Sequence, residues 1–304
     1  MNAVLGGFAT LLAVIAVGWL TGRTGILGAG AAEMLSRLSY YVATPALLLL
    51  TLADADPSAL LSTTLVATAG SAVLCALLYS AVVYWWRRPK AAQLATGALS
   101  TSYVNAGNLG VAIAVYVLGD ASYVAPVLLF QVLVLAPIGL TVLASDQPDR
   151  SLRRLLTQPL RTPVVIGCAI GLALSMLGWR PPELVLRPIE LLAGLAVPAA
   201  LLAYGTSLHG SPRPATGAQA GPIWLAVGLK TVAQPALAFG LGSAVQLSGT
   251  ALLAVTVTSA LPTAQNVFVY ATSHGQDTEL ARDVILLTTM LSIPVLAGIA
   301  LLLG

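Results

Sequence analysis

The chain has 304 residues, of which 58% are hydrophobic and only 8% are charged, and its mean hydropathy is +0.90. A soluble domain carries about 25% charged residues, so this composition excludes a soluble fold and indicates that most of the surface faces lipid. The 14 Lys and Arg residues exceed the 11 Asp and Glu residues only slightly. In a membrane protein such an excess sets orientation rather than nucleic-acid binding.

Hydropathy along the chain predicts ten membrane-spanning helices, each close to the length that a bilayer requires. The first apolar run has no Lys or Arg before it and is followed by Arg23, so we expect a retained span rather than a cleaved signal peptide. The predicted spans are 2–20, 36–53, 60–86, 95–117, 122–143, 162–178, 186–208, 222–245, 250–273 and 281–303.

Positive charge alternates between the connecting loops. If the N-terminus is outside, only Arg180 and Arg187 lie on the outer side. This positive-inside bias predicts a multi-pass protein of the cell (inner) membrane with both termini extracytoplasmic. The residues then placed in or beside the cytoplasmic loops are Arg23, Arg37, Arg87, Arg88, Lys90, Arg150, Arg153, Arg154, Arg161, Arg213 and Arg282.

The longest polar stretch separates five spans from five spans. We therefore expect a first five-helix repeat at 1–144, a cytoplasmic linker at 145–161 and a second five-helix repeat at 162–304. An odd number of spans per half inserts the halves in opposite orientations, so the predicted fold is an all-α membrane protein made of two inverted repeats. Weak internal matches agree with this: Thr44-Pro45 resembles Val197-Pro198, and Val104-Asn105 falls opposite Pro262-Thr263.

Two short segments interrupt membrane-length apolar stretches, each in the fourth span of its half. They are Asn105-Ala-Gly-Asn108-Leu-Gly110 and Leu261-Pro262-Thr-Ala-Gln265-Asn266. Gly or Pro beside uncharged amides is costly in hydrocarbon unless the freed backbone lines a cavity. A matched pair of such segments in two repeat halves is the sequence feature that best indicates the binding site of a secondary transporter.

The interruptions suit a small anion. A helix broken in the membrane exposes free N–H groups and partial positive charge at one end and carbonyls at the other. The side chains of Asn105, Asn108, Gln265 and Asn266 can donate or accept hydrogen bonds, and Gly107 allows close approach of a ligand. The alternative is that the amides only join helices and the glycines only pack.

Lys230 lies within the eighth span, close to Gln234-Pro235. An intramembrane Lys is a functional candidate, here as counter-charge to a substrate anion or as the partner of an acid. The alternative is a side chain that reaches the nearer interface. Cys75 and Cys168 lie in apolar stretches and are expected to be unpaired buried thiols, and neither His209 nor His274 has ligands at metal-binding spacing. We expect no metal and no cofactor.

The first interruption resembles the Asn-x-Gly-x-x-Gly segment of the auxin efflux carrier family, and Leu261-Pro262-Thr-Ala-Gln265-Asn266 resembles its second signature. The family includes plant PIN-formed auxin exporters and bacterial carriers associated with malonate and other carboxylates. The resemblance implies crossed, broken helices four and nine and an elevator movement of the crossing-bearing domain. The chain departs from the family at Val104 and Ala112, where relatives often place Pro, so its first interruption depends on Gly and Asn.

The function predicted from these features is secondary transport of a small organic anion (a carboxylate). The substrate-binding residues would be Asn105, Gly107, Asn108, Pro262, Gln265, Asn266 and Lys230. We find no motif of an intramembrane enzyme or an ATP-driven pump. The alternatives are a carrier-like membrane sensor or receptor, or a sodium-coupled symporter of a different solute class. Proton and sodium coupling both stay open, and Gly167-x-x-x-Gly171 and Gly240-x-Gly242 are compatible with a homodimer.

Overall fold

The computed structural model describes residues 2–28, 30–54, 62–110, 113–114, 118, 121–146, 163–211, 213–276 and 278–303. Across these ranges the protein is helical, with one isolated antiparallel bridge and no strand. Within the described ranges, six helices are long and apolar enough to cross a membrane. They are Ala31–Ala53, Thr63–Arg87, Ala125–Leu143, Glu183–Leu208, Gly217–Ala244 and Glu279–Leu303. The all-α class that the sequence predicts is confirmed.

Helix occupies every predicted span range. The first three spans contain α1 (Asn2–Thr24), then α2 (Ala31–Leu38) with α3 (Thr44–Ala53), then α4 (Thr63–Arg87). The next three contain α5 (Ala91–Ser102), then α7 (Ala125–Phe130) with α8 (Ala136–Leu143), then α10 (Pro163–Leu177). The last four contain α11 (Glu183–Gly194) with α12 (Ala196–Leu208), α13 (Ala220–Gly228) with α14 (Gln234–Ala244), α15 (Gly249–Ser259) with α16 (Asn266–Ser273), and α17 (Glu279–Leu303).

The second span begins earlier than hydropathy indicates. Helix α2 starts at Ala31 rather than at residue 36. Its first turns are polar, and Arg37 lies 2.6 Å from Glu33 one turn away, with both side chains more than half exposed. An exposed polar turn lowers the hydropathy without ending the helix, and an i,i+4 ion pair stabilises it slightly. The sequence therefore located the apolar part of the span but not its start.

Three spans contain a widened π-helical turn in front of a proline. The turns are Ser39–Ala43, Gln131–Leu135 and Leu229–Ala233, and Pro45, Pro137 and Pro235 follow them. A proline lacks the N–H that an α-helix requires and its ring clashes with the carbonyl four residues earlier. A π turn relieves this clash and is a recognised cause of a bend. Each of these turns places a polar side chain inside the protein: Ser39, Gln131 and Lys230.

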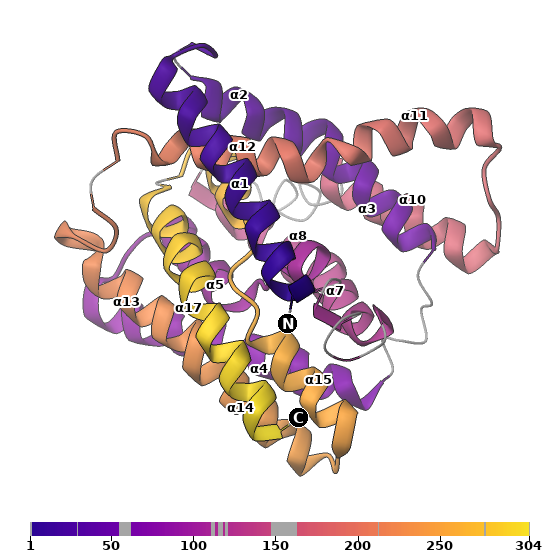
Figure 1. Cartoon of the computed structure of the whole chain (residues 1–304), viewed down its shortest axis with the longest axis vertical. Coiled ribbons are helices and arrows are strands. Elements are labelled where there is room, and N and C mark those ends of the chain that lie inside the picture. The colour runs from indigo at the N-terminus through magenta and orange to yellow at the C-terminus, as the bar shows by residue number, and fades with distance from the viewer. Residues whose placement is uncertain are drawn as a thin grey trace.

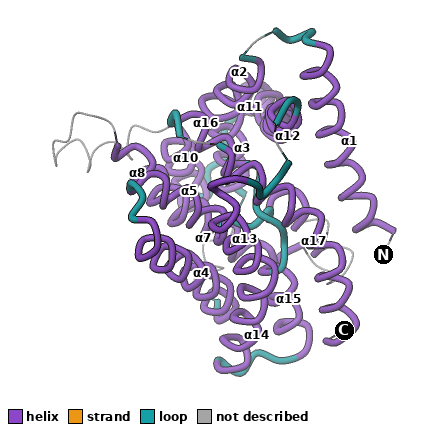
Figure 2. Tube along the Cα trace, turned by 90° about the vertical axis from the view of Figure 1, so that its left-hand side faces the viewer, coloured by secondary structure: helices purple, strands orange, loops and turns teal. Residues whose placement is uncertain are grey.

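The helices pack as two groups (Figures 1 and 2). The first helix group consists of α1, α2, α3, α10, α11 and α12, and the second consists of α4, α5, α7, α8, α13, α14, α15 and α17. In Figure 1, α2, α3, α10, α11 and α12 gather at the upper end, above α4, α13, α14, α15 and α17. Helix α16 contacts both groups, α2 and α12 of the first and α5 and α17 of the second.

Glycines set the closest helix contacts within the first helix group. A Cβ on Gly167 or Gly171 of α10 would lie 2.4 Å from a backbone oxygen of α3. On Gly205 of α12 it would lie 2.1 Å from the Ile15 carbonyl oxygen of α1. The Gly167-x-x-x-Gly171 pattern, which suggested a homodimer, therefore joins two helices of the same chain. Gly242 also packs within the chain, whereas Gly240 has open space beside it.

The described residues leave part of the predicted organisation without a structural description. Most of the predicted linker, including Arg150, Arg153, Arg154 and Arg161, lies outside them. Cys75 and Cys168 lie within them and are free and buried, as the sequence predicts.

Candidate functional site

The ninth span is interrupted because its chain cannot continue as a helix through Pro262. Helix α15 ends at Ser259 and α16 begins at Asn266. The residue before a proline is driven toward extended backbone, and the proline itself has no N–H to donate. With 11 and 8 residues, neither helix is long enough to cross a bilayer alone. The break therefore lies inside the membrane-length segment.

The fourth span is interrupted by a different local structure. Helix α5 has 12 residues and ends at Ser102. Tyr103 has extended backbone, with φ −88° and ψ 101°, and a π-helical turn follows at Ala106–Gly110. The Gly110 N–H donates to the Asn105 carbonyl at 3.0 Å, which closes this turn. A Cβ on Gly110 would lie 3.1 Å from the Leu261 side chain, so glycine permits close approach of the other interruption.

The two interruptions pair with each other through their backbones. Val104 and Thr263 form the isolated antiparallel bridge. The Asn105 N–H donates to the Pro262 carbonyl at 2.8 Å, and the Ala264 N–H donates to the Tyr103 carbonyl at 3.0 Å. Non-helical backbone is tolerated at membrane depth only where its polar groups are satisfied. Each interruption therefore supplies the hydrogen-bond partners that the other lacks.

Side chains extend this pairing. Asn105 Nδ2 donates to Gln265 Oε1 at 3.0 Å, so the amides of the two interruptions touch. The Thr263 hydroxyl donates to the Ser100 carbonyl at 2.6 Å, and the Val104 N–H donates to Gln131 Oε1. Asn105, Gln131 and Gln265 are each no more than 5% exposed. Buried amides are costly unless they are bonded, and this network bonds all three.

A cavity of about 190 Å³ opens beside the paired interruptions. Ligand pockets for drug-sized molecules measure roughly 300–1,000 Å³, so this one suits a small solute. Leu47, Leu128 and Val197 contribute apolar wall. Among the described residues that line it, none carries a formal charge. The polar lining residues are Thr44, Thr51, Asn105, Gln131, Gln265 and Asn266.

The predicted site residues do not all line the cavity. Asn105, Gly107, Gln265 and Asn266 line the cavity. Pro262 does not line it, but its carbonyl accepts from Asn105. Asn108 lies in the π-helical turn, and its side chain is outside the described residues.

Lys230 lies apart from the cavity, beside the end of α15. Its side chain is 0% exposed, which does not fit a side chain that reaches the interface. It does not line the cavity but donates to Gln234 Oε1 and, at 3.3 Å, to the Ser259 carbonyl oxygen. The ammonium therefore sits at the end of α15, on the other side of the break from α16.

Sequence reasoning missed the threonines of the site. Thr44 and Thr51 of α3 face the cavity, and Thr288 of α17 accepts from the Thr263 N–H at 3.2 Å. The spacing of seven residues between Thr44 and Thr51 places them on one helix face, and this signal was available. Nothing in the sequence links Thr288 to the interruption, because their contact depends on how α17 packs.

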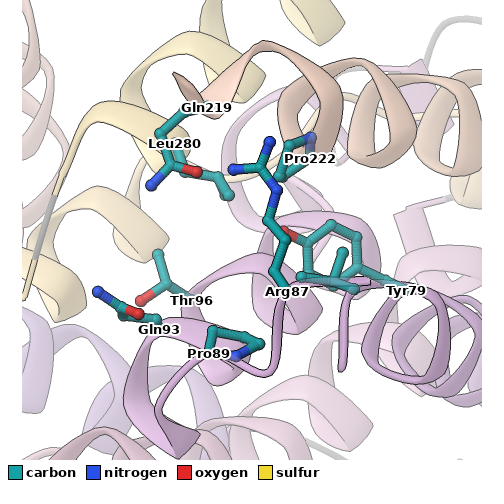
Figure 3. Close-up of a pocket in the computed structure, with 9 residues that line it drawn as sticks. Tyr79, Arg87, Pro89, Gln93, Thr96, Gln219, Pro222 and Leu280 are labelled. Atoms are coloured by element: carbon teal, nitrogen blue, oxygen red, sulfur yellow. The ribbon is translucent and has the colours of Figure 1, made fainter. Parts of the chain in front are cut away.

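A second cavity of about 180 Å³ lies away from both interruptions (Figure 3). It lies among the end of α4, the start of α5, α13 and the start of α17, and Arg87 and Gln219 approach it from different elements (Figure 3). Tyr79 lines it and is 1% exposed. Arg87 also stacks over Trp86 at 4.7 Å from the ring centroid. No residue of either interruption lines this cavity.

Apolar helices that bury paired, broken segments beside a small cavity are typical of a secondary transporter. Comparison with known proteins agrees. The family described as "Membrane transport protein" matches residues 3–147 and 143–300, so the chain belongs to that family. This is the auxin efflux carrier family that the motifs resemble, and the resemblance is confirmed. The protein is therefore a multi-pass membrane protein of a transporter family.

Two relatives extend over nearly the whole chain. A Rhizobium meliloti (strain 1021) protein named "Putative malonate transporter" is 27% identical and aligns with 98% of this chain and 95% of its own length. A Methanothermobacter thermautotrophicus protein named "Uncharacterized transporter" is 23% identical, with 93% of each chain aligned.

Proposed function

We propose that the protein is a secondary carrier of a small organic anion, with malonate or another short dicarboxylate as the first candidate. The single observation that carries the proposal is the cavity of about 190 Å³ at the paired interruptions. Its size suits a solute of a few carbon atoms. The name of the Rhizobium meliloti relative supports a carboxylate.

The way in which the anion is held follows from the lining. Helix α16 begins at Asn266, which lines the cavity, so its N-terminal partial positive charge faces the substrate. The amides of Asn105 and Gln265 and the hydroxyls of Thr44 and Thr51 supply further hydrogen bonds. A site without a full charge binds an anion less tightly than an Arg or Lys clamp. Moderate affinity suits a carrier that must release its substrate.

The proposed architecture is two inverted five-helix repeats, at 1–144 and 162–304, with a linker at 145–161 and crossed broken helices four and nine. Helix in all ten predicted ranges supports it, as does the division of the family match into two segments that meet at 143–147. We further propose both termini outside the cell membrane, as the positive-inside bias predicts.

We propose an elevator movement for alternating access. The cavity lies between the two helix groups, since Thr44 and Val197 belong to α3 and α12 of the first and Leu128 belongs to α7 of the second. Helices α5 and α15, which lead into the two interruptions, belong to the second helix group. Movement of that group against the first would carry the substrate with the interruptions while the wall formed by α3 and α12 stays in place.

The first experiment is thermal unfolding of the detergent-purified protein with malonate, longer dicarboxylates, indole-type acids and amino acids. A ligand that binds the folded state raises Tm by mass action, with about 1.4 kcal/mol gained at ten times the Kd. We expect malonate to raise Tm and expect Asn105→Ala and Asn266→Ala to abolish the shift. The matched control is Gln93→Ala, which removes an amide from the second cavity and should keep the shift.

Uptake of labelled malonate into proteoliposomes tests transport itself. Wild-type rates in both Asn105→Ala and Asn266→Ala would refute the site. Binding of malonate without uptake would favour a receptor over a carrier. A Tm shift from no anion but from a neutral or cationic solute would refute the substrate class.

A further inference from the structure

Lys230 is a buried charge that the proposed substrate site does not use. It lies in the π-helical turn Leu229–Ala233 between α13 and α14 and is fully buried. No carboxylate forms an ion pair with it among the ion pairs of the described residues. A cation at this depth is expensive unless something inside the protein compensates for it. The groups that accept hydrogen bonds from Lys230 must therefore compensate for the cost of burying its charge.

Lys230 has two uncharged oxygens as acceptors, and one of them lies at the end of a broken helix. The Lys230 ammonium donates to Gln234 Oε1, one turn away, and to the Ser259 carbonyl oxygen at 3.3 Å. Ser259 is the last residue of α15. The C-terminal end of a helix carries partial negative charge and carbonyls without helical partners, so a cation is favoured there.

The interruption itself removes the usual donors to this carbonyl. In a continuing helix Ser259 would accept from the backbone N–H of residue 263, or from residue 262 in a tighter turn. Residue 262 is a proline and has no N–H, and the Thr263 N–H donates to the Thr288 hydroxyl at 3.2 Å instead. Lys230 fills the position that the break leaves open.

The side chain of Ser259 also has an oxygen neighbour. The Ser71 hydroxyl of α4 lies 3.4 Å from the Ser259 hydroxyl, and both residues are no more than 1% exposed. A half-helix carbonyl end with neighbouring amide and hydroxyl oxygens is the kind of place where broken-helix carriers coordinate a coupling cation. In this protein a covalently attached ammonium already occupies it.

We propose that Lys230 is a built-in cation that takes the place of sodium at the end of α15 and makes the carrier independent of sodium. The ammonium neutralises the carbonyl end of the broken helix, so no ion has to bind there before the substrate does. Lys230 is a positioning residue that acts through α15. Its effect on transport rests on the proposed function, whereas its effect on sodium binding does not.

The test compares thermal unfolding in sodium chloride and in choline chloride at equal ionic strength, without substrate. The variants are Lys230→Met and the control Lys90→Met, which removes the other lysine of the chain, an exposed one in front of α5. We expect wild type and Lys90→Met to have the same Tm in both salts. Lys230→Met should unfold earlier in choline chloride and regain about 4 °C when sodium reaches ten times its Kd.

If the role of Lys230 is purely structural, Lys230→Met will lower Tm equally in both salts, and that result would overturn the proposal. A wild-type Tm that rises with sodium would overturn it too. If Lys230→Met does not fold, two wild-type measurements decide: Tm in the two salts, and malonate uptake with and without a sodium gradient. Uptake that requires sodium would overturn the proposal. Because the Tm comparison contains no substrate, a failure of malonate binding leaves it intact and identifies the substrate proposal as the error.

Discussion

The two interruptions meet through the same backbone pairing, yet they are built from different chemistry. The ninth span breaks at Pro262 and resumes as the regular helix α16, whereas the fourth breaks without proline and passes through a π-helical turn. At the end of α15 the Ser259 carbonyl accepts a hydrogen bond from the ammonium of Lys230. Near the end of α5 the Ser100 carbonyl accepts one from the neutral hydroxyl of Thr263. One broken helix is therefore compensated by a charge and the other by neutral groups.

The helices behind the interruptions differ in the same way. In span eight, the Lys230 side chain bonds to the end of α15. Span three instead places the ring of Tyr79 against α5 at Gly97. In the inverted repeat that we propose, these two helices are equivalent. On that proposal, the pairing of the two interruptions constrains their backbones but leaves the supporting side chains free to differ. Three substitutions test how far that freedom extends.

The largest effect is expected at the contact behind the fourth span. A Cβ on Gly97 would lie 2.0 Å from Cε1 of the buried Tyr79 ring. Gly97→Ala should therefore destabilise the protein by about 3 kcal/mol through overpacking, and its combination with Tyr79→Ala should lose less stability than the sum of the two single losses. Thermal unfolding measures both. Gly228→Ala in span eight, where a Cβ meets nothing within 4 Å, is the control and should leave Tm nearly unchanged.

A proline in the fourth span tests whether the two interruptions can be made alike. Val104→Pro removes the N–H that bonds the buried Gln131 amide, and an unsatisfied buried acceptor costs about 2 kcal/mol. We expect a lower Tm, with partial recovery in Val104→Pro combined with Gln131→Leu. An unchanged Tm in the single variant would show that this interruption tolerates proline as readily as the ninth span does.

The smallest effect is expected from the neutral support of α5. Thr263→Val removes the hydroxyl that bonds the Ser100 carbonyl, and a side-chain hydrogen bond within a membrane protein is worth about 0.6 kcal/mol. The measured loss of stability should be well below that of Lys230→Met in choline chloride. Thr141→Val, which removes only a bond to Pro137 on its own helix, is the matched control. A loss equal to that of Lys230→Met would mean that charge adds nothing at α15.

The sequence predicted the parts of this structure that depend on local chemistry. Hydropathy located the spans, and Pro262 and the glycines at 107 and 110 located the interruptions. Matching the halves in order even placed Val104-Asn105 opposite Pro262-Thr263, the segments that the structure pairs. These features follow from what each residue does to its own stretch of backbone.

Features that depend on which helices become neighbours were not predictable. Periodicity gives the face on which Lys230 lies but not that the end of α15 lies opposite it. The pattern at Gly167 and Gly171 indicates a close helix contact, yet only the packing shows that the partner is α3 of the same chain. The role of Thr288 likewise arises from a tertiary contact, because it bonds a backbone N–H of an interruption 25 residues away in sequence.

The pairing of the interruptions also has a consequence for biogenesis. Asn105 and Gln265, whose amides join the two segments, are 160 residues apart. At roughly 5–20 residues per second, the ribosome needs on the order of 10–30 s to synthesise the second segment after the first. During that time the backbone at 103–105 has no native partner, although hydrocarbon penalises unpaired groups. The first half must therefore wait at the translocon, or at a membrane chaperone, in a conformation that differs from its final one.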